Sequence, residues 1–366
     1  MAEKRCFICG ELLTDDNKSK EHILLNAAGG KLKTYDIMCK SCNAKLGSKP
    51  DEALALQLRP LANFLGVKRD NGTTPNVLLQ SASDKKYEMR DGGRPVLGEA
   101  YIDFDPSTGK TIVEAGTIGQ ARTALWNFKK AHPECNLDVE EVLKHFTNRT
   151  EYIDEPLKFD TKWGGEEAFR SIAKAAMGYF IYKGHDRRHI SHLIEYLLGD
   201  EKKDIVKIYY PDQQPFTLVE GEVLNLIHIV GNKSAATLFA YVVYLGCFPS
   251  IILLSDHYDG EDFTETYAHD VMAHQEVDKT ITLNMTIDRF KNYHPHQGNF
   301  KENANKMYVH SIRAGQTKQE MEERVDIIQN AFTDLPEGAQ IDDETIKKLE
   351  DGLMKHIKHL LRIKDK

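Results

Sequence analysis

Hydrophobic positions along the chain change their spacing twice, and each change predicts a different kind of element. Residues 166–182 carry apolar side chains at helical spacing, which predicts a helix whose buried stripe is Phe169, Ile172, Ala176 and Phe180. From residue 205 the pattern becomes β-branched and aromatic runs divided by turns, which predicts an antiparallel meander with a buried face. Its strands are expected at 205–210, 223–230, 238–245 and 250–255.

Weaker patterns fill the rest of the chain and complete an α+β fold. Two short alternating runs flank the turn-rich segment Asp105–Gly109, which predicts a hairpin of strands 100–104 and 110–114. A further strand is expected at 279–283. Helical periodicity predicts helices at 118–131, 139–146, 190–198, 318–332 and 343–363.

Two Cys-x-x-Cys pairs near the N-terminus predict a metal site. Thiolates two residues apart can reach one ion through a tight turn, and two such pairs complete a tetrahedral four-sulfur site. The pairs are Cys6/Cys9 and Cys39/Cys42. The segment between them contains an acid-histidine pair, Glu21-His22, and a Gly29-Gly30 pair, and Asn43 follows the last cysteine directly. A purely structural zinc clip needs neither the acid-histidine pair nor the asparagine.

This order of motifs resembles the zinc-stapled HNH endonucleases over about the first 50 residues. The resemblance implies a ββα-metal module in which the four cysteines hold a structural Zn²⁺. It implies that His22 is the general base and that Glu21 and Asn43 hold a catalytic Mg²⁺ or Mn²⁺. The family often has an asparagine that orients the base five residues before the third cysteine. Thr34 stands there instead, so the chain departs from the family at the orienting position.

Phosphodiester hydrolysis gives these residue types independent support. The reaction needs a deprotonated water and a cation on the scissile phosphate, and an imidazole supplies the first near neutral pH. Adjacent residues of an extended strand point to opposite faces, however. Glu21 and His22 can therefore face one phosphate only if a bulge or a strand end lies between them.

The sequence after the cysteines predicts how the module ends. Asn43 to Gly47 is expected to open the helix of the ββα unit, Pro50 to interrupt it, and Asp51 to cap a second helix that runs to Phe64. The expected organisation is a nuclease module, a docking helix with a connector, a larger α+β domain and a C-terminal helix, at residues 1–50, 51–75, 76–335 and 336–366.

Charge is distributed unevenly along the chain. The formal net charge is -8, but residues 1–70 carry 12 Lys and Arg against 9 Asp and Glu, so the remainder carries -11. DNA contacts are therefore expected only on the front module, where five lysines surround the predicted site: Lys31, Lys33, Lys40, Lys45 and Lys49. The acidic remainder is expected to restrain or direct the nuclease, through a ligand, a homo-oligomer or a partner subunit.

The start of the chain has no apolar signal segment, and the longest apolar run is broken by Gly246 and Pro249. Cytoplasmic location without membrane contact is therefore expected, and a reducing compartment suits zinc-bound thiolates.

Two further polar clusters leave alternatives open. Residues 184–189 with His192 suit either a phosphate site or an exposed loop between helices. His269-Asp270 with His274 suggests a metal site, although a spacing of five does not stack two imidazoles on one helical face.

The function expected from these observations is DNA cleavage by an HNH endonuclease under the control of the C-terminal domain. Similar layouts occur in bacterial or phage nucleases of antiviral defence. The alternative is a non-catalytic zinc knuckle that binds DNA or a protein partner. The combination of Glu21, His22 and Asn43 favours the enzyme, because binding alone does not require all three.

Overall fold

The computed structural model describes residues 3–361 except 71, 106, 109, 134, 136, 148–152, 154, 159–161, 296–297, 334, 336–337 and 339. It is a mixed α+β fold with antiparallel sheets, as predicted. The chain forms two compact units, and each is built from two separate stretches. Unit 1 holds Met1–Pro75 and Thr161–Gly315, and unit 2 holds Asn76–Asp160 and Gln316–Lys366. The linear division expected from the sequence differs, because residues 161–315 share a core with the N-terminal module.

Unit 1 is organised around a six-stranded antiparallel sheet with the order β14-β13-β10-β11-β12-β9. Four of its strands lie where strands were predicted, and β10, β11 and β12 form the predicted meander, whereas β9 pairs with β12 and not with β10. The polar strand β13 was not predicted, and residues 279–283, which the structure describes, do not form the expected strand. The strands are β9 (Val206–Ile208), β10 (Leu224–Asn232), β11 (Thr237–Tyr244), β12 (Phe248–Ser255), β13 (Phe263–Asp270) and β14 (Gln275–Glu276).

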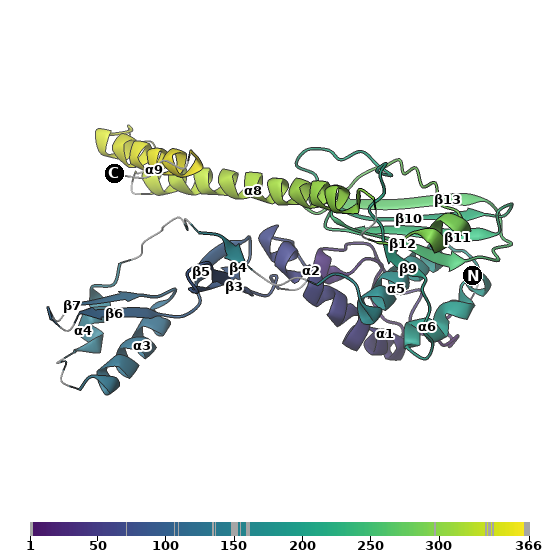
Figure 1. Ribbon diagram of the computed structural model, residues 1–366, viewed down its shortest axis with the longest axis horizontal. Coiled ribbons are helices and arrows are strands. Elements are labelled where there is room, and N and C mark those ends of the chain that lie inside the picture. Colours follow the sequence, from purple (N-terminus) through teal and green to yellow (C-terminus); the bar gives the residue numbers. More distant parts are fainter. Residues whose placement is uncertain are drawn as a thin grey trace. The chain divides into compact units, whose positions relative to one another are not determined.

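Helix α5 (Glu166–Tyr182) begins and ends at the predicted residues and lies across one face of this sheet (Figure 1). Nearly all of its residues from 168 to 180 are buried, on every side of the helix. A helix of this kind is enclosed by protein. Besides the sheet, α5 packs against the N-terminal module. At Gly178 the contact is close, because a Cβ atom there would lie 3.6 Å from Ile37 Cδ1 and 3.7 Å from Ile23 Cδ1.

The N-terminal module has a two-stranded sheet, β1 (Glu21–His22) with β2 (Lys33–Thr34), separated by a 3₁₀ turn, η1 (Asn26–Ala28). Helix α1 (Lys40–Leu46) follows and begins three residues before the predicted opening at Asn43, with Cys39 as its N-cap. This is the ββα arrangement that the sequence predicts.

The helical segment continues past α1 without the expected break. A π-helical turn, η2 (Gly47–Asp51), joins α1 directly to α2 (Glu52–Phe64). The predicted interruption at Pro50 is therefore wrong, because the proline lies inside the wider π turn. Asp51 lies at the predicted N-cap position of α2, which ends at Phe64 as predicted, but its side chain makes no capping bond and its carboxylate accepts hydrogen bonds from α5 instead.

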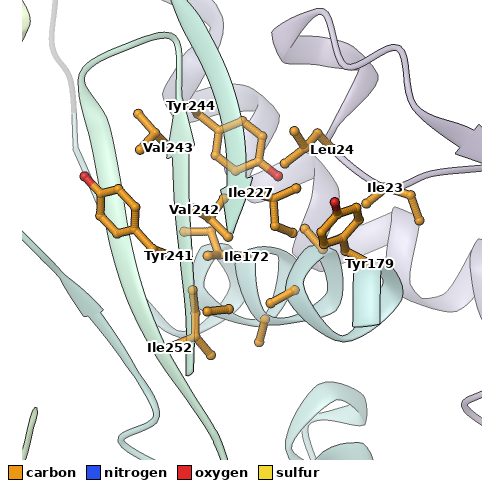
Figure 2. Close-up of a cluster of buried hydrophobic side chains, with 14 of the residues drawn as sticks. Ile23, Leu24, Ile172, Tyr179, Ile227, Tyr241, Val242, Val243, Tyr244 and Ile252 are labelled. Carbon is orange, nitrogen blue, oxygen red and sulfur yellow. The ribbon is translucent and has the colours of Figure 1, made fainter. Parts of the chain in front are cut away.

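One continuous core joins the module, α5 and the sheet. Figure 2 shows Ile23 and Leu24 of the module beside Tyr179 of α5, with Ile227 and Tyr244 of the sheet in the same cluster. All five side chains are buried. The N-terminal module is therefore part of the hydrophobic core of unit 1, and its stability is coupled to that of the sheet.

The helices that complete unit 1 cover shorter segments. The region predicted as a helix at 190–198 follows a 3₁₀ turn, η3 (Arg187–His189). It begins with a second one, η4 (Ser191–Leu193), and ends in α6 (Ile194–Leu198). Helix α7 (Ile287–Asn292) follows the sheet. Helix α8 (Phe300–Phe332) starts well before the predicted residue 318, and the boundary between the units falls within it.

The described residues of unit 2 form two antiparallel sheets and three helices that lie wholly inside the unit. The predicted hairpin is present as β6 (Tyr101–Asp105) with β7 (Lys110–Glu114). A second sheet, with order β5-β4-β3-β8, was not predicted; its strands are β3 (Val77–Ser81), β4 (Lys86–Arg90), β5 (Arg94–Leu97) and β8 (Leu157–Lys158). The helices are α3 (Ile118–Ala131), α4 (Val139–Lys144) and α9 (Asp343–Leu360). Ile363, the predicted end of the last helix, lies outside the described residues.

Within the described part of the chain, no helix combines the length and the apolar character that crossing a bilayer requires.

His228 in β10 makes the stability of unit 1 sensitive to acid. Its ring is buried and its Nδ1 lies 2.8 Å from Thr266 Oγ1. Burial lowers the pKa of His228 from 6.5 to about 4. Below pH 6.5 the unfolded chain takes up a proton that the folded chain excludes, so stability present above pH 6.5 falls as the pH drops toward 4. We expect this residue to account for about 3 kcal/mol at pH 4.

Denaturant unfolding of the wild type and of His228→Gln between pH 7 and pH 4 tests this expectation. The variant is expected to lose less stability on acidification, and His257→Gln, at an exposed histidine, serves as the matched control. Parallel loss of stability in the wild type and His228→Gln would contradict the assignment.

Candidate nuclease site in the N-terminal module

The four cysteines of the two pairs form one cluster. Their sulfur atoms all lie within 4.8 Å of one another, and the Sγ atoms of Cys9 and Cys39 are 3.8 Å apart. A tetrahedron with Zn–S bonds of about 2.3 Å has sulfur–sulfur edges of about 3.8 Å. The cluster therefore fits a structural zinc ion, which Cys6, Cys9, Cys39 and Cys42 would hold.

The loop that carries the first pair is fixed from two sides. Gly10 closes the turn with φ +77° and donates its N–H to Cys6 O at 2.8 Å. Arg187, from the segment after α5, donates to Phe7 O at 2.6 Å and to Ile8 O at 2.9 Å. The polar segment 184–189, for which a phosphate site and an exposed loop were the alternatives, thus contributes an arginine that binds the backbone of the zinc knuckle.

Glu21 belongs to a buried ion-pair triad. Its Oε1 lies 2.7 Å from Lys174 Nζ of α5, and the same ammonium lies 2.6 Å from Asp51 Oδ2. Ser171, one turn earlier on α5, donates to Asp51 Oδ1 at 2.6 Å. Only 4% of Glu21 and 5% of Lys174 is exposed, so water cannot substitute for these partners.

The electrostatics of the triad favour a charged lysine. Burial alone would lower the pKa of Lys174, but the carboxylates of Glu21 and Asp51 outweigh burial and raise it. Burial raises the pKa of Glu21, and Lys174 opposes that rise. The triad therefore places a cation, the Lys174 ammonium, directly against the carboxylate that was predicted to bind a metal.

His22 lies on the opposite side of β1 from Glu21. It is half-buried, and its Nε2 lies 3.0 Å from Asp70 Oδ2. Burial lowers the pKa of His22, with Lys33 and Lys20 acting in the same direction and Asp70 opposing them. The ring is therefore neutral near pH 7, which is the form a general base needs.

Three lysines gather on Asp70. The Nζ atoms of Lys33, Lys20 and Lys31 lie 2.8, 3.4 and 3.5 Å from its carboxylate oxygens. Hydrogen bonds from Lys33 and from His22 hold the pKa of Asp70 well below its usual range. The cluster around His22 thus has three ammonium groups and one carboxylate, a positive balance that attracts a polyanion.

The Gly29-Gly30 pair lets the backbone pack closely beside this cluster. Gly29 has φ +83°, and a Cβ atom there would lie 2.7 Å from Val67 Cγ1. A Cβ atom at Gly30 would lie 1.9 Å from Leu24 O. Glycine at position 29 therefore lets the connector that carries Asp70 pack against the β1–β2 loop, and glycine at position 30 lets that loop close on its own backbone at Leu24.

The other two predicted site residues take different positions. Asn43 on α1 donates its Nδ2 to Ser19 Oγ at 2.6 Å. Thr34 is buried and pairs with Glu21 in the β1–β2 register, which places its side chain on the Glu21 face of the hairpin. Its Oγ1 accepts the N–H of Asp36 at 3.1 Å. Among the described residues, the carboxylate that contacts the His22 ring belongs to Asp70.

The second candidate metal cluster does not assemble. Asp270 accepts the backbone N–H groups of Val223 at 3.2 Å and of Met272 at 2.9 Å, and His269 is buried in β13. In the described part of the chain, the four cysteines are the only group of three or more His, Cys, Asp or Glu whose ligand atoms lie together.

Comparison with protein families identifies the module. Residues 6–59 match the family described as HNH endonuclease. The front of the chain is therefore an HNH module with a four-cysteine cluster, which confirms the resemblance inferred from the sequence. No curated protein and no solved structure matches the chain.

Two residues of the site were missed from the sequence. Lys174 is the one charged residue in the otherwise apolar run 172–181, and such a residue signals a buried ion pair. Asp70 lies in the turn-rich connector 68–75 and beyond the residues that match the family, so no pattern distinguished it.

Proposed function

We propose that the HNH module is an endonuclease that hydrolyses phosphodiester bonds in DNA, with His22 as the general base. The observation that carries the proposal is the partly exposed His22 ring, which contacts Asp70 in a module of this family, beside the three lysines that pair with the same carboxylate: Lys20, Lys31 and Lys33. An imidazole among ammonium groups is suited to act on a water molecule beside a bound phosphate.

The proposed step balances with water as the only co-reactant. A water oxygen forms a bond to phosphorus while its proton passes to His22. The bond from phosphorus to the ester oxygen breaks, and the leaving oxygen takes up a proton from solvent. The lysines bind and orient the phosphate backbone, and they oppose the negative charge that builds on the phosphate oxygens.

A catalytic Mg²⁺ or Mn²⁺ held by Glu21 and Asn43 does not fit the arrangement of these residues. The bond from Asn43 Nδ2 to Ser19 leaves an amide oxygen of the right chemistry for such an ion. Glu21, however, is buried against the Lys174 ammonium, and a divalent cation there would meet a positive charge 2.7 Å from the same carboxylate.

The test is cleavage of supercoiled plasmid by the full-length protein in Mg²⁺, in Mn²⁺ and in chelator. His22→Ala is expected to lower the cleavage rate at least about 10²-fold, or about 3 kcal/mol in the barrier, because the proton acceptor is removed. Zinc content and DNA affinity are expected to stay near the wild-type values. His257→Ala, at an exposed histidine, is the control.

Cleavage by His22→Ala at the parental rate would remove His22 from the mechanism. If the wild type binds DNA but cuts it under none of these conditions, a second candidate function takes over. This is a zinc-stapled module that binds DNA or a protein partner without catalysis, and the pairing of Glu21 with Lys174 is the observation that favours it.

The proposal extends to control and to biological role. Residues 161–315 belong to the same core as the module and therefore serve its folding. We assign the regulatory role to unit 2, which forms a separate compact unit. A role in antiviral defence predicts that cells carrying the wild-type protein resist phage infection and that cells carrying His22→Ala do not. Equal plaque counts on the two strains would reject that role.

A further inference from the structure

Asp70 contributes to the site from outside the residues that match the HNH family. It follows α2 in the connector, beyond residue 59, and its Oδ2 lies 3.0 Å from His22 Nε2. Both side chains are largely shielded, with 16% of Asp70 and 20% of His22 exposed. A contact at this depth is less open to competition from water than a surface pair.

Several contacts fix Asp70 in place independently of His22. Its backbone N–H donates to Asn26 Oδ1 at 3.0 Å, and Lys31 donates to the preceding backbone at Lys68 O, 3.1 Å away. The close approach of Gly29 to Val67 packs the same connector against the β1–β2 loop. The carboxylate is therefore held by its backbone and does not depend on the imidazole for its position.

The chemistry of the pair determines which ring nitrogen carries the proton. The surrounding ammonium groups, with Lys33 at 2.8 Å, keep Asp70 ionised, and an ionised carboxylate only accepts hydrogen bonds. Nε2 of His22 must then be the donor. In a neutral imidazole the other nitrogen, Nδ1, is left with its lone pair and is the atom that can accept a proton.

We propose that Asp70 is the positioning residue for His22: its carboxylate fixes the ring orientation and selects the tautomer in which Nδ1 is free to take the proton of the attacking water. This inference rests on the proposed function of His22. It assigns to the connector the orienting role that the family resemblance had placed at Thr34, which lies on the other face of the hairpin. When Nδ1 takes up the proton, Asp70 also stabilises the imidazolium that forms.

The same geometry permits a rival role with the opposite consequence. A carboxylate among three lysines resembles a bound phosphate, so Asp70 would inhibit the enzyme if it occupied the place of the DNA backbone. Removing the charge would then increase DNA affinity and cleavage. The two roles predict changes of opposite sign, and one substitution separates them.

The experiment uses Asp70→Asn and Asp70→Glu in the full-length protein, with Asp15→Asn as the control at an exposed carboxylate of the same module. Single-turnover plasmid cleavage gives the rate and the apparent affinity separately. The tautomer of His22 is read at fixed pH from long-range ¹H–¹⁵N NMR spectra, with His22→Ala used to assign the ring. Zinc content and thermal unfolding verify that the variants are folded.

Asp70→Asn is expected to slow the chemical step by about 10- to 100-fold with little change in affinity. Asp70→Glu is expected to recover part of the rate, and Asp15→Asn to match the wild type. The wild-type ring is expected to carry its proton on Nε2, and a substantial fraction in Asp70→Asn is expected to shift to the Nδ1–H form.

Two results would overturn the positioning role alone: an Nδ1–H tautomer in the wild type, or an Asp70→Asn variant that cuts as fast as the wild type or faster. The absence of wild-type cleavage in every cation tested would overturn the proposed function, and the catalytic meaning of Asp70 with it. The NMR measurement would still show whether the carboxylate sets the tautomer.

Discussion

Replacing Cys39 with Ser is expected to abolish zinc binding and to unfold the part of unit 1 that the cluster holds together. Cys39 is buried and occupies the N-cap position of α1, and its Sγ lies 3.8 Å from the Sγ of Cys9. A structural zinc ion contributes on the order of 10 kcal/mol to folding, as much as the usual stability of a whole domain. We therefore expect about one zinc per wild-type chain by elemental analysis, none in the variant, and a marked fall in its unfolding temperature.

The control for this prediction is Cys135→Ser, at a cysteine of unit 2 outside the cluster, which should keep its zinc. Hydrogen exchange should show where Cys39→Ser unfolds. Protection should be lost in the two knuckles and in α1, and reduced in α5, because all of them share one core. Normal zinc and normal melting in Cys39→Ser would disprove the four-sulfur site.

Lys174→Met is expected to destabilise unit 1 by about 3–5 kcal/mol, the usual cost of leaving a buried charge without its partner. The ammonium lies 2.7 Å from Glu21 and 2.6 Å from Asp51, so its removal leaves two carboxylates in a buried site. The free energy of unfolding from denaturant titrations measures the effect. Methionine nearly preserves the length of the side chain, so the lost stability comes from removing the charge and not from a change in volume.

Two further variants make the Lys174 result specific. Lys183→Met removes a half-exposed lysine just after α5, whose partner is Glu265 at 2.7 Å, and should cost about 1 kcal/mol or less. Neutralising the whole triad, with Glu21→Gln, Asp51→Asn and Lys174→Met together, should recover much of the loss. A change no larger in Lys174→Met than in Lys183→Met would show that the triad contributes little.

The fold could be predicted where burial is periodic. The boundaries of α5 were predicted because its apolar residues repeat at helical spacing. Four strands of the large sheet were predicted from their apolar runs. Strand β13 and the first half of α8 lack such a repeat. β13 is held by pairing with β10, and α8 contacts the core partly through small residues such as Ser311 and Gly315. These contacts come from distant segments and leave no local pattern.

The site could be predicted as a set of residue types but not as a set of contacts. The cysteine cluster follows from spacing alone, because each pair is one tight turn. The orientations of Glu21 and His22 also follow from the sequence, because adjacent residues of a strand point their side chains to opposite faces. Their partners do not follow: Lys174 is 153 positions from Glu21, and Asp70 lies 48 from His22. Only tertiary packing brings these pairs together.

The interleaving of the two units has a consequence for the order in which the protein is made. The four cysteines are synthesised before residues 161–315, yet the core that encloses them is complete only after the chain has reached residue 315, about 240 residues beyond Asp70. At about 5–20 residues per second, a ribosome needs roughly 10–50 s to cover that distance. For part of this interval Glu21 has no Lys174 to pair with, and Arg187 is not yet present to bind the backbone of the first knuckle. The HNH module is thus translated well before the residues that complete its core, and its folding is finished only when they have been made.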